Sequence, residues 1–99
     1  MEHGKRKVIV PDVPAHAFAP VPVLHSDIDL NGHMNNAQYV RIATDLLPEG
    51  FEPTHMRIVH DGQAKLGDEV LPQRLDEGDT HYFKLANGQG APLATLEFS

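Results

Sequence analysis

Residues 26–39 of this 99-residue chain read SDIDLNGHMNNAQY, and they decide how the rest of the sequence is interpreted. The first part of the stretch is polar and contains a glycine, and the residues after it are apolar with a helical period. This pattern predicts a loop that leads into a helix over residues 36–47, with Asn35 or Asn36 as its N-cap. The Pro-Glu-Gly sequence at 48–50 is expected to end the helix.

The expected helix has a wide apolar surface. One stripe of residues at helical spacing is widened by three larger side chains on its flank. A stripe of this width predicts a helix that is buried on most of its sides. The stripe consists of Ala37, Val40, Ala43, Thr44 and Leu47, and the flank of Tyr39, Ile42 and Leu46.

After residue 54 the sequence has the pattern of short strands separated by turns. Polar turn signals occur at 76–79 and 87–90, and Pro72 predicts an edge strand, a bulge or a break where it falls. One helix followed by three or four antiparallel strands is an α+β fold, in which the apolar face of the sheet covers the helix. The strands are expected at 56–61, 68–75, 80–86 and 93–98.

The beginning of the chain has a different character. Four prolines within residues 1–22 interrupt any helix or central strand. We therefore expect residues 1–20 to form a linker-like arm and residues 21–99 to form the folded domain, with a short strand near Pro22. The basic cluster at residues 5–7 is expected to be a solvated part of the arm.

Composition excludes several classes of function. The chain has 8 Lys and Arg against 14 Asp and Glu, and a net charge of −6 argues against binding to nucleic acids. Cysteine is absent, which excludes disulfides, a thiol nucleophile and cysteine-ligated metals. No Gly-x-Ser-x-Gly motif is present, so a nucleophile-elbow hydrolase is excluded. Without a membrane-spanning apolar run or a signal-peptide pattern, we expect a cytoplasmic protein with no membrane partner.

Residues 27–36 concentrate two carboxylates, one imidazole and three amides at a predicted helix N-terminus. The positive end of the helix dipole and the free backbone N–H groups there favour a developing negative charge. Backbone N–H groups near residues 32–35 can polarise a carbonyl oxygen while a carboxylate activates water, which suits hydrolysis of a carbonyl compound. A second interpretation is an ordinary capped turn with no catalytic role, because such a turn has the same composition. A third interpretation is a metal site made from His25, Asp27, Asp29 and His33, although their spacing matches no known metal motif.

The stretch 26–39 resembles the signature of hotdog-fold thioesterases. It is most similar to the second hotdog domain of the acyl-acyl-carrier-protein (acyl-ACP) thioesterases, which carries S-D-[IL]-D-x-N-x-H-V-N-N-x-x-Y. Residues 58–70, which read IVHDGQAKLGDEV, resemble the strand pattern I-x-Y-x-x-E-A-x-x-G-D-x-V of that family. With the helix end at 45–48, the resemblance covers about residues 21–75.

This resemblance implies a single hotdog domain, in which an antiparallel sheet wraps a long central helix. It also implies hydrolysis of acyl thioesters, foremost of fatty acyl-ACP in fatty acid biosynthesis, with release of free fatty acid and without a cofactor. The catalytic residues of the family correspond to Asp29, Asn31, His33 and, in place of a glutamate, Gln63. We expect substrate contacts from Gly32, Asn35, Asn36 and Tyr39.

The chain departs from the family in two respects. An amide such as Gln63 cannot act as a base, so Asp29 is the essential carboxylate or the site is inactive. Members of the family have two hotdog domains in tandem, whereas this chain corresponds to the second one only. We therefore expect a homodimer, a pairing with a second hotdog domain, or a fragment of a longer or split gene product. The alternative function is a degenerate hotdog domain that binds acyl chains or pairs with another subunit, and the thiol carrier, ACP or coenzyme A, stays open.

Overall fold

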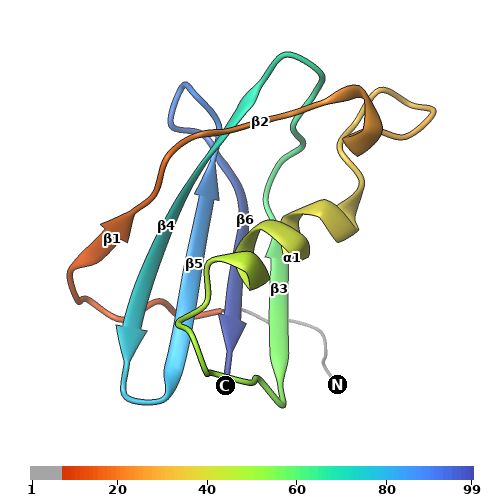
Figure 1. Cartoon of the computed structure of the whole chain (residues 1–99). Helices are drawn as coiled ribbons and strands as arrows, with labels where there is room; N and C mark the ends of the chain where they lie inside the picture. Colours follow the sequence, from red (N-terminus) through yellow and green to blue (C-terminus); the bar gives the residue numbers. More distant parts are fainter. Residues whose placement is uncertain (1–7) are drawn as a thin grey trace, which may run out of the picture.

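The computed structural model describes residues 8–99, so the expected solvated cluster at residues 5–7 lies outside the described residues. The sheet has the strand order β1-β4-β5-β6-β3, with β2 also paired to β4, and all pairings are antiparallel. The one α-helix of the described residues, α1, lies across one face of this sheet (Figure 1). The predicted α+β class is therefore confirmed. The elements are β1 (Ala15–Ala17), β2 (Val21–Pro22), the 3-10 turn η1 (His25–Asp27), α1 (Asn36–Asp45), β3 (Met56–His60), β4 (Glu69–Glu77), β5 (Thr80–Ala86) and β6 (Pro92–Phe98).

Helix α1 begins where the sequence predicts. The side chain of Asn35 accepts a hydrogen bond from the Ala37 N–H at 2.9 Å, which confirms Asn35 as the N-cap. The helix ends at Asp45, two residues earlier than expected. The reason is a tighter last turn, because the N–H groups of Leu46 and Leu47 bond to carbonyls three residues back instead of four.

The burial of α1 differs from the prediction. Tyr39, Ile42 and Ala43 face the sheet and are buried, whereas Ala37 and Thr44 are exposed. The expectation of a helix buried on most sides is therefore wrong. The sheet covers one side of α1 only, and small residues such as alanine and threonine are compatible with either side.

Strand β4 runs without a break through Pro72, so the prediction of an edge, bulge or break there is wrong. The carbonyl of Pro72 accepts a hydrogen bond from the Phe18 N–H at 3.0 Å, on the side of β4 that faces β1 and β2. The nitrogen of a strand residue points to the same side as its carbonyl. The Pro72 nitrogen, which carries no hydrogen, therefore points to the gap between β1 and β2. No strand pairs with β4 at this position, so no hydrogen bond of the sheet is lost.

Part of the expected arm belongs to the sheet. Ala15–Ala17 pair with β4 opposite residues 73–75, and this makes β1 an edge strand. The prolines on either side exclude a central strand, as expected, but an edge strand tolerates them. Val8 and Ile9, further upstream, line a hollow together with Val59 and Thr95 on the other side of the sheet from α1.

The core lies between α1 and the sheet. The face of β5 that turns toward α1 carries Phe83 and Leu85, and its neighbours on β6 are Leu96 and Ala94 in direct register. The rings of Phe83 and Phe98 pack edge to face with centroids 5.8 Å apart. In the part of the chain that is described, no helix is long and apolar enough to cross a membrane.

Candidate functional site

The polar stretch before α1 folds into a tight loop. Ile28 and Met34 form an antiparallel bridge, and the Asp29 N–H donates to the His33 carbonyl at 2.8 Å. Gly32 closes the loop by donating its N–H to the Asp29 carbonyl, at a φ of +79° that favours glycine. Asp29 and His33 are therefore opposite each other at the base of the loop.

The Asp29 carboxylate stabilises this loop with one of its two oxygens. Its Oδ1 accepts hydrogen bonds from the N–H groups of Asn31 at 2.9 Å and His33 at 3.2 Å. Within residues 8–99 no group donates a hydrogen bond to Oδ2, and Asp29 is exposed. The loop thus holds a carboxylate in a fixed position with one oxygen directed to solvent.

A second segment of the chain lies beside the loop. His33 bridges with Lys65, and the Met34 N–H donates to the Ala64 carbonyl at 2.8 Å. Met34 and Ala64 are buried, whereas Gln63 and Lys65 are exposed. Because side chains alternate along extended backbone, His33, Gln63 and Lys65 share the outward face. Gln63 is a diagonal neighbour of His33 across the two paired segments, about 7 Å away.

Contacts from two elements hold this second segment in place. The buried Tyr39 hydroxyl of α1 accepts a hydrogen bond from the Ala64 N–H at 2.9 Å. On the other side, a Cβ at Gly62 would lie only 2.7 Å from the Pro92 carbonyl oxygen, so only glycine lets the chain approach β6 this closely. The N–H of Gly62 also donates to the Leu93 carbonyl. Helix α1 and strand β6 therefore fix the position of the backbone next to Gln63.

The structure brings most of the predicted site residues together on one surface. Asp29, His33 and Gln63 come from three adjacent backbone segments, and Asn31 lies at the tip of the loop. Among the described residues no hydrogen bond joins the side chains of these four residues to one another. Asp29, Asn31 and Gln63 are exposed, so this candidate site is an open surface on the isolated chain.

The expected oxyanion hole at residues 32–35 is not available in this structure. All four backbone N–H groups already donate to acceptors within the chain: those of Gly32 and His33 to Asp29, that of Met34 to Ala64, and that of Asn35 to Asp27. The first turn of a helix leaves donors unpaired, but Ala37 and Gln38 donate to the Asn35 cap. The N–H of Asn36 remains without an acceptor in the described part of the chain.

Asp27 has a structural role. It is buried, and its Oδ2 accepts a hydrogen bond from the Leu24 N–H at 2.9 Å, which orients the start of η1.

In residues 8–99 no group of three or more His, Asp or Glu side chains is placed to hold a metal ion. The hypothesis of a metal site at His25, Asp27, Asp29 and His33 therefore gains no support from these residues.

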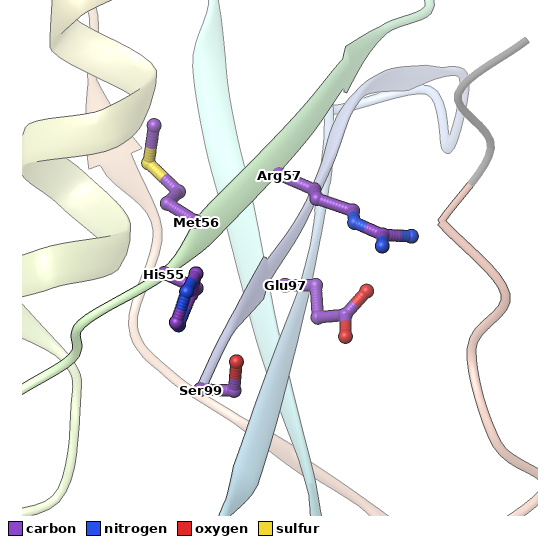
Figure 2. Close-up of a pocket in the computed structure, with 5 residues that line it drawn as sticks. All are labelled: His55, Met56, Arg57, Glu97 and Ser99. Carbon is purple, nitrogen blue, oxygen red and sulfur yellow. The ribbon is translucent and has the colours of Figure 1, made fainter.

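A hollow of about 240 Å³ lies at the other end of the sheet, where β3 begins and β6 ends. Figure 2 shows Met56 pointing toward α1, with Arg57 and Glu97 on the opposite side of the sheet. The N–H of His55 and the N–H of Ser99 each donate to the other residue's carbonyl, so paired backbone forms the floor of the hollow. None of the predicted site residues lines it.

A cluster of charged side chains that the sequence did not reveal lies at the C-terminal end of α1. Nδ1 of the buried His81 lies 2.6 Å from an Asp76 carboxylate oxygen, and Nε of Arg74 lies 3.1 Å from the same oxygen. Arg74 also donates to the Leu46 carbonyl at 2.7 Å, and the Phe51 ring packs edge-on against His81. The hairpin turn at 78–79 sets Asp76 opposite His81, and that register is the signal that could have revealed the pair.

Comparisons with known proteins agree with this arrangement of helix, loop and sheet. A helix on an antiparallel sheet, entered through this loop, is the hotdog fold of thioesterases. The family model for the acyl-ACP thioesterase C-terminal domain matches residues 12–97. The chain therefore belongs to the acyl-ACP thioesterase C-terminal domain family.

Solved structures share the fold at low sequence identity. An acyl-ACP thioesterase from Bacteroides thetaiotaomicron is 17% identical with a TM-score of 0.81 over 99% of this chain, and this chain covers 41% of that protein. A Staphylococcus aureus protein solved in complex with CoA is 19% identical, with a TM-score of 0.72 and coverages of 86% and 71%. A Streptococcus mutans protein bound to acetyl-CoA is 14% identical, with a TM-score of 0.73 and coverages of 91% and 82%. No match was found among curated proteins.

Proposed function

We propose that this protein hydrolyses acyl thioesters in the cytoplasm, with fatty acyl-ACP as its substrate and a free fatty acid as its product. Membership of the acyl-ACP thioesterase C-terminal domain family supports this assignment. The observation that carries it is the Asp29 carboxylate, which is held by one oxygen and exposed through the other, opposite His33 and before the N-terminus of α1.

In the proposed reaction, Oδ2 of Asp29 takes a proton from a water molecule as that water attacks the thioester carbon. The carbonyl oxygen becomes negatively charged. We assign its stabilisation to the N–H of Asn36, which lies at the positive end of α1 and has no acceptor among residues 8–99. Collapse of the intermediate breaks the carbon–sulfur bond. His33 passes the proton that Asp29 took from the water to the leaving sulfur, so the product departs as a thiol and Asp29 is again a carboxylate. Asn31 and Gln63 orient the water by hydrogen bonds.

The second candidate function is that of a catalytically degenerate domain, which binds acyl chains or pairs with another subunit. The presence of glutamine at position 63 favours it. An amide at this position orients a water molecule but does not remove its proton. Substitution Gln63→Glu separates the two candidates. A large gain in hydrolysis indicates a degenerate site, whereas an unchanged rate indicates that Asp29 is the base and that Gln63 has only a positioning role.

We further propose that a second copy of the chain, or a second hotdog domain, covers the site. Asp29 and Gln63 are exposed, and an acyl chain needs apolar walls that exclude water. Leu30, in the loop, is fully exposed, and Leu24 and Leu66 are about half exposed. Leu66 follows Lys65, which bridges with His33 of the loop, and exposed apolar side chains of this kind suit a covered surface. The B. thetaiotaomicron thioesterase is more than twice the length of this chain, so it contains protein beyond the matched part.

The test is release of free thiol from acyl-ACP and acyl-CoA thioesters of varied chain length by the purified protein. The chain contains no cysteine and so contributes no thiol background. We expect turnover by the wild type and a loss of about 100-fold or more in Asp29→Asn, because a general base contributes that much. The matched control is Asp45→Asn, an exposed aspartate on α1 whose replacement should leave the rate unchanged. A folded wild type without turnover on any thioester, or an active Asp29→Asn, would overturn the proposal.

A further inference from the structure

We propose that Lys65 binds the phosphate at the end of the pantetheine arm, a group that ACP and coenzyme A share. This inference rests on the proposed function, because it assigns the part of the site that holds the thiol carrier. Lys65 stands at an unspecified position of the strand pattern at residues 58–70, which gives it no role.

The distribution of positive charge singles out Lys65. Arg41 and Arg74 are engaged in ion pairs with Asp45 and Asp76. The other cationic side chains of the described chain, Arg57 and Lys84, lie on the sheet face opposite α1, because their neighbours Ile58, Phe83 and Leu85 face the core. Lys65 is therefore the only Lys or Arg of residues 8–99 that lies next to the loop with Asp29.

Backbone pairing fixes where Lys65 stands relative to the reacting groups. Asp29 pairs with His33, and His33 bridges with Lys65, so the three residues occupy neighbouring backbone segments. Two strand spacings separate Asp29 from Lys65, which is about 10 Å. Directly opposed residues have side chains on the same face, so the Lys65 side chain emerges beside His33. In the pantetheine arm, two amide units separate the sulfur from the phosphate. A residue that binds the phosphate must therefore lie some distance from the catalytic carboxylate, as Lys65 does.

Local contacts leave the ammonium group of Lys65 available. Its side chain is exposed, and no carboxylate in residues 8–99 lies within 4 Å of its nitrogen. The nearby carboxylate of Asp68 accepts a hydrogen bond from the Lys65 backbone N–H at 2.9 Å and so stabilises the turn instead. Asp61 and Glu69 add negative charge to the same segment. A phosphate that approaches this acidic region therefore depends on the single ammonium group for attraction.

The first test compares substrates with and without the phosphate. In Lys65→Gln we expect KM to rise about tenfold for both acyl-ACP and acyl-CoA, with kcat unchanged, since a charge-assisted contact is lost. The KM for an acyl-N-acetylcysteamine thioester, which has no phosphate, should stay at the wild-type value. Lys65→Arg should retain most of the affinity, and Lys84→Gln, which removes the same charge on the opposite sheet face, should behave like the wild type.

The second test needs no turnover. Calorimetric titration with 4′-phosphopantetheine and with pantetheine should show phosphate-dependent binding to the wild type that is lost in Lys65→Gln. Equal binding of the two ligands, or an unchanged affinity in Lys65→Gln, overturns the assignment of Lys65 even when thioesters are hydrolysed. A rise in KM for acyl-CoA alone also overturns it, because the contact is then to a phosphate that ACP lacks. Phosphate-dependent binding without hydrolysis supports Lys65 and refutes the proposed enzymatic activity.

Discussion

The two ends of α1 are built from similar side chains that are used in opposite ways. At the N-terminal end, Asp29 and His33 make their hydrogen bonds mostly to backbone and leave polar groups open to solvent. At the C-terminal end, Arg74, Asp76 and His81 bond to one another and to the Leu46 carbonyl.

The difference in hydrogen bonding gives the two ends of α1 different roles, one in ligand binding and the other in stability. Side chains that satisfy one another in a partly buried network fix the end of the helix to the sheet, and they have little capacity left for a ligand. Side chains held by backbone alone keep free donors and acceptors at a fixed position, as a binding site requires. Substitutions in the Arg74, Asp76 and His81 cluster should therefore change stability, and substitutions of Asp29 or His33 should change activity.

The largest stability effect is expected from Arg74→Met. The substitution removes the contacts to Asp76 and Leu46 and the packing of the guanidinium over the Phe18 ring. We expect the free energy of unfolding to fall by about 2 kcal/mol in urea denaturation. The rate of thiol release per folded molecule should not change. Arg41→Met is the control, because its ion pair with Asp45 is exposed and contributes less than about 0.5 kcal/mol. Equal effects of the two substitutions would contradict the role given to the cluster.

Tyr39→Phe tests whether the hydrogen bond between the Ala64 N–H and the Tyr39 hydroxyl positions the candidate site. The substitution leaves the buried Ala64 N–H without an acceptor, which costs about 1–2 kcal/mol. It also releases the segment that carries Gln63 and Lys65, so we expect a lower kcat as well as a lower melting temperature. Tyr82→Phe is the matched control, since no hydrogen bond of the Tyr82 hydroxyl is present among the described residues. A Tyr39→Phe protein with normal kcat would show that this hydrogen bond does not position the site.

A smaller effect is expected at the helix cap. Asn35→Ala removes the acceptor for the Ala37 N–H and should lower the free energy of unfolding by about 1 kcal/mol. Asn36→Ala changes an exposed amide without a hydrogen bond in the described structure, and its effect on thermal unfolding should be smaller. If the order of the two effects were reversed, the assignment of Asn35 as the cap would be wrong.

The smallest effect is a pH dependence on the sheet face opposite α1. Burial, and then the charges of Glu97 and Glu77, raise the pKa of Tyr82 above its ordinary value of 10.0. The folded protein therefore keeps the phenol proton at a pH where the unfolded chain has lost it. Stability from this group is complete below pH 10 and declines as the pH rises through the folded pKa. Melting temperatures of the wild type should fall more steeply above pH 10 than those of Tyr82→Phe.

Much of the local structure could be predicted from the sequence. The cap at Asn35 and the strands around the two turns follow from short-range rules of backbone geometry and alternation. The exposure of Ala37 and Thr44 could not be predicted, because small residues carry no clear preference for either side of a helix. Pro72 was misjudged because its cost depends on what faces its nitrogen, and that is a property of the neighbouring strands.

The α+β hotdog fold and the distinctive chemistry of residues 26–39 could be inferred without a structure, because they follow from local pattern and from the family resemblance. Which groups of that stretch remain available for a ligand depends on the tertiary structure. It assigned the N–H groups of residues 32–35 to internal acceptors and placed Lys65 beside His33. The physical reason is that hydrogen-bond partners and cross-strand neighbours are distant in sequence, so their identity is fixed only when the sheet forms.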